Sequence, residues 1–179
     1  VASLVQSLAE LPMNKKITMA LVLSLAVLGC DSNKPQDSKK KLADQWKAAR
    51  AAVQYSLAKQ EYEAGDVDSS RKDCDQALTL NPKLPVALIL SAKISIEKGQ
   101  LDRADAALSQ ARELEPKNPE PDYYAGIVYQ RWQKFQQALE FYTRANEKAP
   151  NEPSYLLARV ETLVALNKSD EALDRKSVG

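Results

Sequence analysis

Three short segments of this chain share one pattern: Asn81-Pro-Lys-Leu-Pro85, Glu115-Pro-Lys-Asn-Pro119 and Ala149-Pro-Asn-Glu-Pro153. They are 34 residues apart, and each carries two prolines three positions apart. Proline cannot continue a helix, but it fits the first turn of a new one, where its missing amide hydrogen is not needed. The pattern therefore predicts helices that end and restart at these segments, in a unit that repeats every 34 residues.

Small residues recur with the same period, as expected where two helices approach closely. A turn is expected midway through each unit, because Gly and Asn accept the left-handed backbone conformation that ends many helices. Gln133 accepts it less readily, so we expect the third turn to be looser or differently shaped. The recurring small residues are Ala58, Ala92 and Gly126, then Ala77, Ala111 and Ala145, then Ser70, Ala104, Ala138 and Ala172; the turns are Gly65-Asp66, Gly99-Gln100, Gln133-Lys134 and Asn167-Lys168.

From Ala51 to Asp174 this pattern resembles the tetratricopeptide repeat (TPR), with the family's period, its alanines and its terminal proline. The resemblance implies an all-α fold, a right-handed superhelical α-solenoid of antiparallel helix pairs with about three and a half repeats. Three repeats are expected at 51–84, 85–118 and 119–152, and an incomplete fourth at 153–176, followed by a tail at 177–179.

The segment before the repeats has the features of a secretory signal. A basic start precedes an apolar run over Ile17–Leu28, which is too short to span a membrane permanently. Gly29-Cys30 resembles the lipobox of bacterial lipoproteins, although Leu28 stands where that motif carries a small residue. The resemblance implies a signal peptide over 13–30 and lipid attachment at Cys30; the alternative is an ordinary signal peptide in which Cys30 is incidental. Residues 1–12 are interpreted as a non-native or mis-assigned start, and 31–37 as a flexible tether.

Both ends of the repeat array carry additional expectations. Residues 38–50 lack Gly and Pro, so we expect a helical extension that begins near Ser38 and continues to about Ala64, with Trp46 covering the open end of the stack. At the other end, apolar residues such as Leu156 and Leu163 need a partner surface. We expect that the natural chain continues or that this end docks on another subunit, for example by self-association.

The family resemblance also implies a binding surface. TPR proteins bind partners on a concave groove lined mainly by the first helix of each repeat, and aromatic and apolar groups there suit an extended peptide or an amphipathic helix. The alternative is that some of these residues only pack, and that Lys59 and Glu63 form an exposed helix pair. The carboxylate clamp of one TPR subset is absent, because its positions carry Tyr55, Lys59, Leu90, Glu120 and Tyr124. The expected groove residues are Tyr55, Lys59, Tyr62, Ile89, Lys93, Ile96, Tyr123, Ile127, Gln130 and Arg131.

Composition limits the chemistry. There is no His, the formal net charge is +1 and no basic stripe is evident, so the sequence offers no nucleophile–His pair and no electrostatic case for nucleic acid. Cys74 is expected to be a buried, unreactive thiol. We therefore expect no catalytic residues, no metal site and no cofactor.

Together these features favour a lipid-anchored adaptor of the bacterial cell envelope, facing the periplasm or exterior, that binds a protein or peptide partner. Lipoproteins of this kind commonly serve in pilus, secretion, exopolysaccharide or cell-wall complexes. Two alternatives stay open: a fragment of a longer TPR protein whose missing part carries an enzymatic or regulatory activity, and a soluble cytosolic TPR protein.

Overall fold

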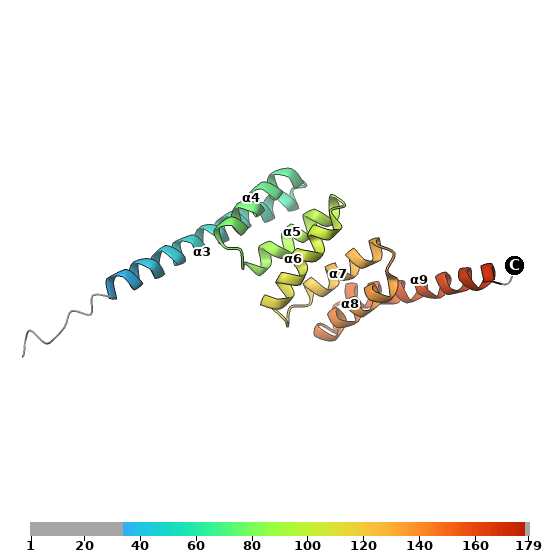
Figure 1. Cartoon of the computed structure of the whole chain (residues 1–179). Helices are drawn as coiled ribbons and strands as arrows, with labels where there is room; N and C mark the ends of the chain where they lie inside the picture. Colours follow the sequence, from blue (N-terminus) through green and yellow to red (C-terminus); the bar gives the residue numbers. More distant parts are fainter. Residues whose placement is uncertain (1–33, 178–179) are drawn as a thin grey trace, which may run out of the picture. The chain divides into compact units, whose positions relative to one another are not determined.

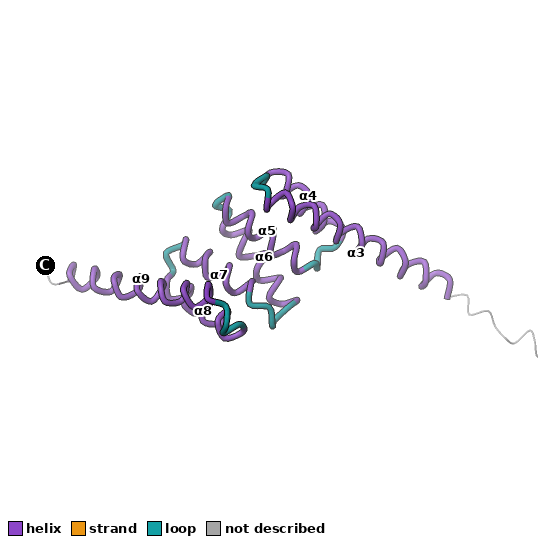
Figure 2. The backbone as a smooth tube through the Cα atoms, turned by 180° about the vertical axis from the view of Figure 1, so that it is seen from behind, coloured by secondary structure: helices purple, strands orange, loops and turns teal. Residues whose placement is uncertain are grey.

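The computed structural model describes residues 34–177, and it describes side chains from 37 to 167. Over these residues it contains helices and no strands, so the all-α prediction is confirmed (Figures 1 and 2). The predictions for 1–12, for the signal peptide at 13–30 and for Cys30 lie outside the described residues. The helices are α3 (Lys34–Glu63), α4 (Val67–Leu80), α5 (Pro85–Glu97), α6 (Leu101–Leu114), α7 (Glu120–Arg131), α8 (Phe135–Lys148) and α9 (Pro153–Ser177).

Successive helices pair into hairpins that follow one another in chain order. The chain divides into two units between Ala43 and Asp44, within α3, and the helices α4 to α9 belong to the second unit. There α5 packs against α6 and α7 against α8, while α4 contacts α5, α6 contacts α7 and α8 contacts α9 (Figure 1). Each hairpin thus covers its apolar side with its neighbours, as a solenoid requires.

The repeated proline segments separate the hairpins as predicted. Pro85 and Pro153 are the first residues of α5 and α9, and Pro119 is the N-cap residue of α7. A proline at these places costs no helical hydrogen bond, because the first amides of a helix have no partner within it.

The third hairpin turn differs from our expectation. Gln133 has a φ of 60°, close to the 83° of Gly65 and the 69° of Gly99. All three turns also share one hydrogen-bond pattern; in the third, the Gln133 amide donates to the Gln130 carbonyl and the Lys134 amide to the Tyr129 carbonyl. The prediction of a looser or different turn was wrong: packing of the flanking helices holds Gln133 in a conformation that suits glycine.

The expected fourth hairpin is a single helix. α9 runs without a break through Asn167-Lys168, where a turn was predicted. Only Ala172 and Leu173 are apolar between Lys168 and Ser177, so a second helix here has little surface to bury in return for forming a turn.

The N-terminal extension also corrects two expectations. α3 begins at Lys34 and not near Ser38, so residues 34–37 of the expected tether are helical. Pro35 is compatible with this because it lies in the first turn. Trp46 is 67% exposed, so it does not cover the stack.

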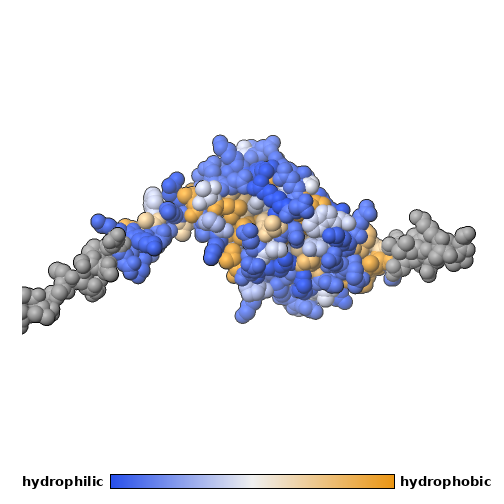
Figure 3. All heavy atoms as spheres, in the orientation of Figure 1, coloured by the Kyte–Doolittle hydropathy of each residue, from blue (hydrophilic) through white to orange (hydrophobic). Residues whose placement is uncertain are grey.

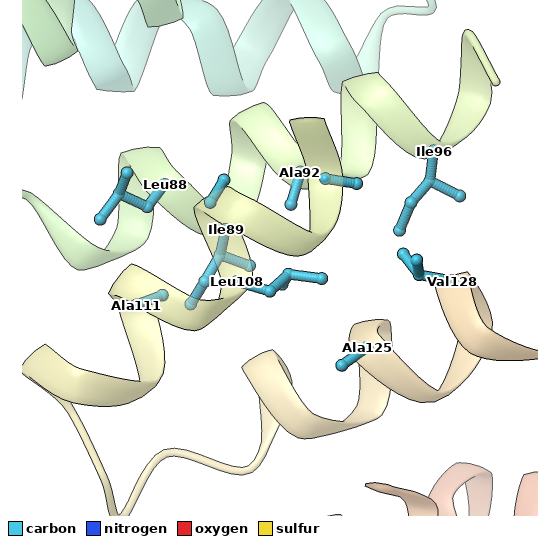
Figure 4. Packing of buried hydrophobic residues seen from close by; sticks show 10 residues of the cluster. Leu88, Ile89, Ala92, Ile96, Leu108, Ala111, Ala125 and Val128 are labelled. Atoms are coloured by element: carbon cyan, nitrogen blue, oxygen red, sulfur yellow. The ribbon is translucent and has the colours of Figure 1, made fainter. Parts of the chain in front are cut away.

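The small residues of the 34-residue register lie in the core. Ala58, Ala92 and Ala111 are fully buried, and Figure 4 shows Ala92 of α5 and Ala111 of α6 within one apolar cluster with Leu108 of α6. Gly126 is buried against the ring of Tyr142 from α8, which is 1% exposed. The period in the sequence thus reports close contacts between helices.

A buried carboxylate joins three helices and was not anticipated from the sequence. The Asp122 side chain of α7 is 1% exposed and has three cations around it. Its Oδ1 lies 3.6 Å from Nη1 of Arg112 on α6 and 3.4 Å from Nε of Arg144 on α8, and its Oδ2 accepts a hydrogen bond from Nζ of Lys148. The guanidinium groups of Arg112 and Arg144 also contact the Phe141 ring. A charge at such depth is tolerated because it is paired several times.

Candidate peptide-binding groove

The first helices of the first two repeats form a pocket on one side of the array. Residues spaced by three or four positions share one face of a helix, and here one face of α3 meets one face of α5. Glu120, at the start of α7, completes the wall. The pocket has a volume of about 330 Å³ and is lined by Tyr55, Lys59, Tyr62, Glu63, Val86, Ile89, Leu90, Lys93 and Glu120.

Lys93 is held at the centre of this surface by two aromatic rings. Its Nζ lies 5.3 Å from the ring centre of Tyr62 on α3 and 5.2 Å from that of Tyr124 on α7. A cation over a tyrosine face is stabilised by the ring quadrupole, by about 0.5–1 kcal/mol at an exposed site. The ammonium group is therefore placed in advance, and it still has hydrogen atoms to donate.

Two further polar contacts set the edge of the groove. The hydroxyl of Tyr62 donates a hydrogen bond to Oε1 of Glu97. Lys59 Nζ lies 3.7 Å from Oε1 of Glu63, and both side chains are more than half exposed. An exposed pair of this kind contributes little to stability, so a ligand can rearrange it at small cost.

The tyrosine hydroxyls of the pocket remain protonated at neutral pH. Burial raises the pKa of Tyr55, with a further increase from the nearby charge of Glu120. Burial and then the hydrogen bond to Glu97 raise the pKa of Tyr62. Both phenols are therefore neutral. The Tyr55 hydroxyl can donate to a partner's backbone carbonyl, whereas the single hydroxyl hydrogen of Tyr62 is donated to Glu97.

Half of the expected groove residues meet in this pocket. Tyr55, Lys59, Tyr62, Ile89 and Lys93 line it together. The other expected groove residues fit the alternative interpretation better, in which some of these residues only pack within the fold.

Ile96 is 6% exposed and points toward Val128 in the core, as Figure 4 shows, which leaves it little surface for a ligand. Ile127 is partly buried against the same core cluster. Tyr123 stacks near Tyr155, with ring centres 4.9 Å apart. These three residues contribute to the packing between repeats.

The remaining two expected residues hold neighbouring groups in place. Gln130 Oε1 accepts a hydrogen bond from the hydroxyl of Tyr142 at 2.8 Å. Arg131 Nη1 donates to the backbone carbonyl of Ile96 at 2.5 Å. Both are occupied within the chain.

One lining residue was missed although the sequence contained the information. Val86 lies 34 positions before Glu120, so the two occupy the same register in successive repeats. Leu90 and Glu120 had been noted only as positions of the absent clamp. Applying the 34-residue period to the position of Glu120 would have placed Val86 in the wall of the pocket.

Comparisons with known proteins agree with this geometry. Residues 61–125 match the family model of the tetratricopeptide repeat. The first TPR of Spaghetti (RPAP3), solved with an HSP90 peptide SRMEEVD, superposes with a TM-score of 0.64 at 18% identity, over 67% of this chain and 95% of that one. The TPR domain of Arabidopsis OM64 gives 0.64 at 13% identity, over 66% and 98%. The chain has a tetratricopeptide repeat fold.

Those two solved TPR chains consist of little beyond the matched stretch, so a TPR array of this length folds as a domain by itself. Among curated proteins, anaphase-promoting complex subunit 3 of Schizosaccharomyces pombe is 25% identical over 120 residues. That stretch is 66% of this chain but only 18% of the relative, so the similarity concerns the TPR array alone.

The charge in the TPR groove is arranged differently from a carboxylate clamp. The wall carries Lys59 and Lys93, but also Glu63 and Glu120, so its formal charge is balanced. Glu120 would repel the terminal carboxylate of a peptide placed beside it. The groove thus fits the interior of a polypeptide segment better than its C-terminal end.

The residues that the structure describes offer little support for a metal site, a membrane-spanning helix or a reactive thiol. No group of three or more His, Cys, Asp or Glu side chains there is placed to hold a metal ion. None of the described helices is both long enough and apolar enough to cross a bilayer. Cys74 is 1% exposed, its thiol donates to the Ala87 carbonyl, and burial raises its pKa to about 12. It is the buried thiol that was predicted.

Proposed function

We propose that this TPR protein is a non-enzymatic adaptor that binds a segment of a partner protein in the pocket between α3 and α5. The observation that carries the proposal is the juxtaposition of Tyr55, Ile89 and Lys93 in one pocket of about 330 Å³. The aromatic and aliphatic groups bury apolar side chains of the segment, while Lys93 and the Tyr55 hydroxyl donate hydrogen bonds to its carbonyl groups.

The chemistry of the wall indicates what the segment looks like. An uncharged or charge-balanced stretch with apolar side chains, in an extended or helical conformation, matches a wall with equal numbers of Lys and Glu. The fold similarity supports the proposal, because the Spaghetti TPR was solved with a bound peptide. Identity to that protein is only 18%, so its ligand is not carried over.

We further propose that the adaptor is anchored in the bacterial cell envelope through acylation of Cys30, facing the periplasm or exterior. Two or three acyl chains suffice for stable anchoring. On this proposal the partner is a component of an envelope assembly, of the kind that builds a pilus, a secretion apparatus, exopolysaccharide or cell wall.

Co-purification tests the groove. Partners crosslinked in membranes are quantified by mass spectrometry for the wild type and for a Tyr55→Ala/Lys93→Ala variant. A matched control changes Lys83 and Lys117 to Ala, two exposed lysines outside the pocket. We expect the wild type and the control to recover the same amount of the same partner. The groove variant should recover at least about tenfold less of it, because central contacts of the interface have been removed. Equal recovery with the groove variant would refute the proposal.

Palmitate labelling tests the anchor separately. The wild type is expected to incorporate label and to sediment with membranes, whereas a Cys30→Ala variant incorporates none. Equal labelling of both proteins would show that Cys30 is not the attachment site.

A further inference from the structure

The N-terminal part of α3 has an exposed side. Every described side chain from Asp37 to Arg50 is exposed, including Trp46. Val53, further along the same helix, is 69% exposed. An isolated helix of this length is only marginally stable in water, and exposed aromatic surface is costly to hydrate. A surface that covered this side would therefore be stabilised by the apolar contact.

The exposed residues after Asp44 have a distinct arrangement around the helix. Trp46, Ala49 and Val53 are spaced by three and four, so they form one apolar stripe. A shallow hollow of about 240 Å³ lies on this stripe and is also lined by Arg50. Figure 3 shows hydrophobic surface on this helix bordered by hydrophilic surface.

The charges are not distributed evenly around the stripe. Arg50 follows Ala49 and lies beside the hollow, and Lys47 follows Trp46. Asp44 is two residues from Trp46, which at 3.6 residues per turn places it on the opposite side. In the sequence, Lys39–Lys41 add three more basic residues, against a single further acid at Asp37. On this stretch of α3 the apolar stripe is therefore bordered by positive charge, and Asp44 faces away from it.

We propose that this side of α3 lies on the surface of an anionic lipid bilayer. Trp46 and Val53 would enter the headgroup region, where tryptophan is preferred, while Lys47 and Arg50 contact lipid phosphates. A second copy of the chain is a poorer occupant, because two such basic faces would repel each other. This surface does not depend on acylation of Cys30 or on a ligand in the groove.

Vesicle binding tests the proposal with a protein of residues 34–179, which contains both core clusters and lacks Cys30. A Trp132→Phe background leaves Trp46 as the single tryptophan of the two in the sequence. We expect this protein to sediment with vesicles of phosphatidylcholine and phosphatidylglycerol, much less with phosphatidylcholine alone, and to be released by salt. The emission of Trp46 should move to shorter wavelength only with the anionic vesicles.

Two charge variants sharpen the result. Lys47→Gln/Arg50→Gln should lower the partition coefficient by about 30-fold, since each basic residue near an anionic surface contributes about a factor of five. Lys83→Gln/Lys117→Gln removes the same charge from exposed positions elsewhere and should leave partitioning nearly unchanged. Since all four side chains are exposed, circular dichroism should match the wild type.

Three outcomes would overturn the proposal. One is binding that does not distinguish anionic from neutral vesicles. Another is an equal decrease of the partition coefficient in both charge variants, which would show only a general effect of net charge. The third is self-association without lipid that shifts the Trp46 emission, because a second copy would then cover the stripe.

Discussion

A Cβ atom on Gly126 would lie 2.4 Å from Cε1 and 2.5 Å from Cδ1 of the Tyr142 ring, well inside van der Waals contact. The equivalent positions in the two earlier repeats carry Ala58 and Ala92, both fully buried. The third repeat accommodates a large ring at this contact only by giving up the methyl group on the facing helix. Small residues in this register are thus set by the partner side chain.

Gly126→Ala should therefore destabilise the protein by about 1–3 kcal/mol, the usual cost of overpacking, although alanine gains about 1 kcal/mol in helix propensity. Urea denaturation followed by circular dichroism measures the change. The same substitution in a Tyr142→Leu background should cost much less, because the clashing ring is gone. An unchanged or raised midpoint for Gly126→Ala alone would contradict the packing argument.

Gln133 shows the opposite situation, in which a residue tolerates a backbone that does not suit it. Its φ of 60° is left-handed, a conformation that costs a side-chain-bearing residue about 1–2 kcal/mol. Gln133→Gly should raise the free energy of unfolding by about 1 kcal/mol. Gly99→Ala is the matched reverse change: it has the same kind of φ and no atom within 4 Å of the added Cβ. Gly99→Ala should lower the free energy of unfolding by about as much as Gln133→Gly raises it. If Gly99→Ala lowers this free energy but Gln133→Gly does not raise it, the third turn is not strained.

At the scale of the helix, the 34-residue period predicted most of the architecture because both of its markers act locally. The proline pairs fix where α5 and α9 begin, and Gly65 and Gly99 fix the turns of the first two hairpins. The period did not predict the straight course of α9, since whether a turn forms there depends on what the following helix can bury. Only five of the ten expected groove residues line the pocket for a related reason: the register gives the face on which a residue lies, but not whether a neighbouring repeat covers it.

The contact between α6 and α7 depends on chemistry that the period conceals. Leu88 and Asp122 share one register, as do Leu78 and Arg112. Leu78 packs against the core cluster that contains Leu88, and one repeat later the same two positions carry the ion pair of Arg112 and Asp122. The family pattern gives no indication that a buried ion cluster replaces an apolar contact here.

Asp122→Leu should lower the free energy of unfolding by about 3 kcal/mol. The substitution leaves three cations, Arg112, Arg144 and Lys148, around a site without a counter-charge. Adding Arg112→Leu should recover part of that loss, since the two positions then carry the leucines that stand one repeat earlier, Leu78 and Leu88. A double-mutant cycle in urea measures the coupling, which we expect to exceed about 1 kcal/mol. Additive effects would show that the two side chains do not act together.

At the scale of the whole molecule, buried hydroxyl and thiol groups set the stability at high pH. Burial raises the pKa of Tyr155 to about 12 and of Cys74 to about 12, and it also raises the pKa of Tyr123 and Tyr142. These groups are protonated in the folded chain at pH values where the unfolded chain has begun to lose their protons. Their contribution is complete below the unfolded pKa values, near 9 for the thiol and 10 for the phenols, and it is lost as the pH rises toward 12.

The urea midpoint should therefore change little up to about pH 9 and fall between about pH 10 and 12. Tyrosinate absorbance should show part of the phenols ionising late, together with unfolding. Cys74 should resist thiol reagents until the same transition. Early, independent ionisation of every tyrosine would contradict the burial.

The ion cluster at Asp122 has a consequence for how near-identical hairpins find their proper neighbours. Hairpins of one length and one pattern could dock in the wrong sequence, with the third seated on the first. In that arrangement Asp122 would face Leu78 and bury its charge without compensation, which strongly disfavours the misassembled form. The buried ion cluster at Asp122 therefore favours docking of the third hairpin on the second, and this contributes to assembly of the solenoid in a single order.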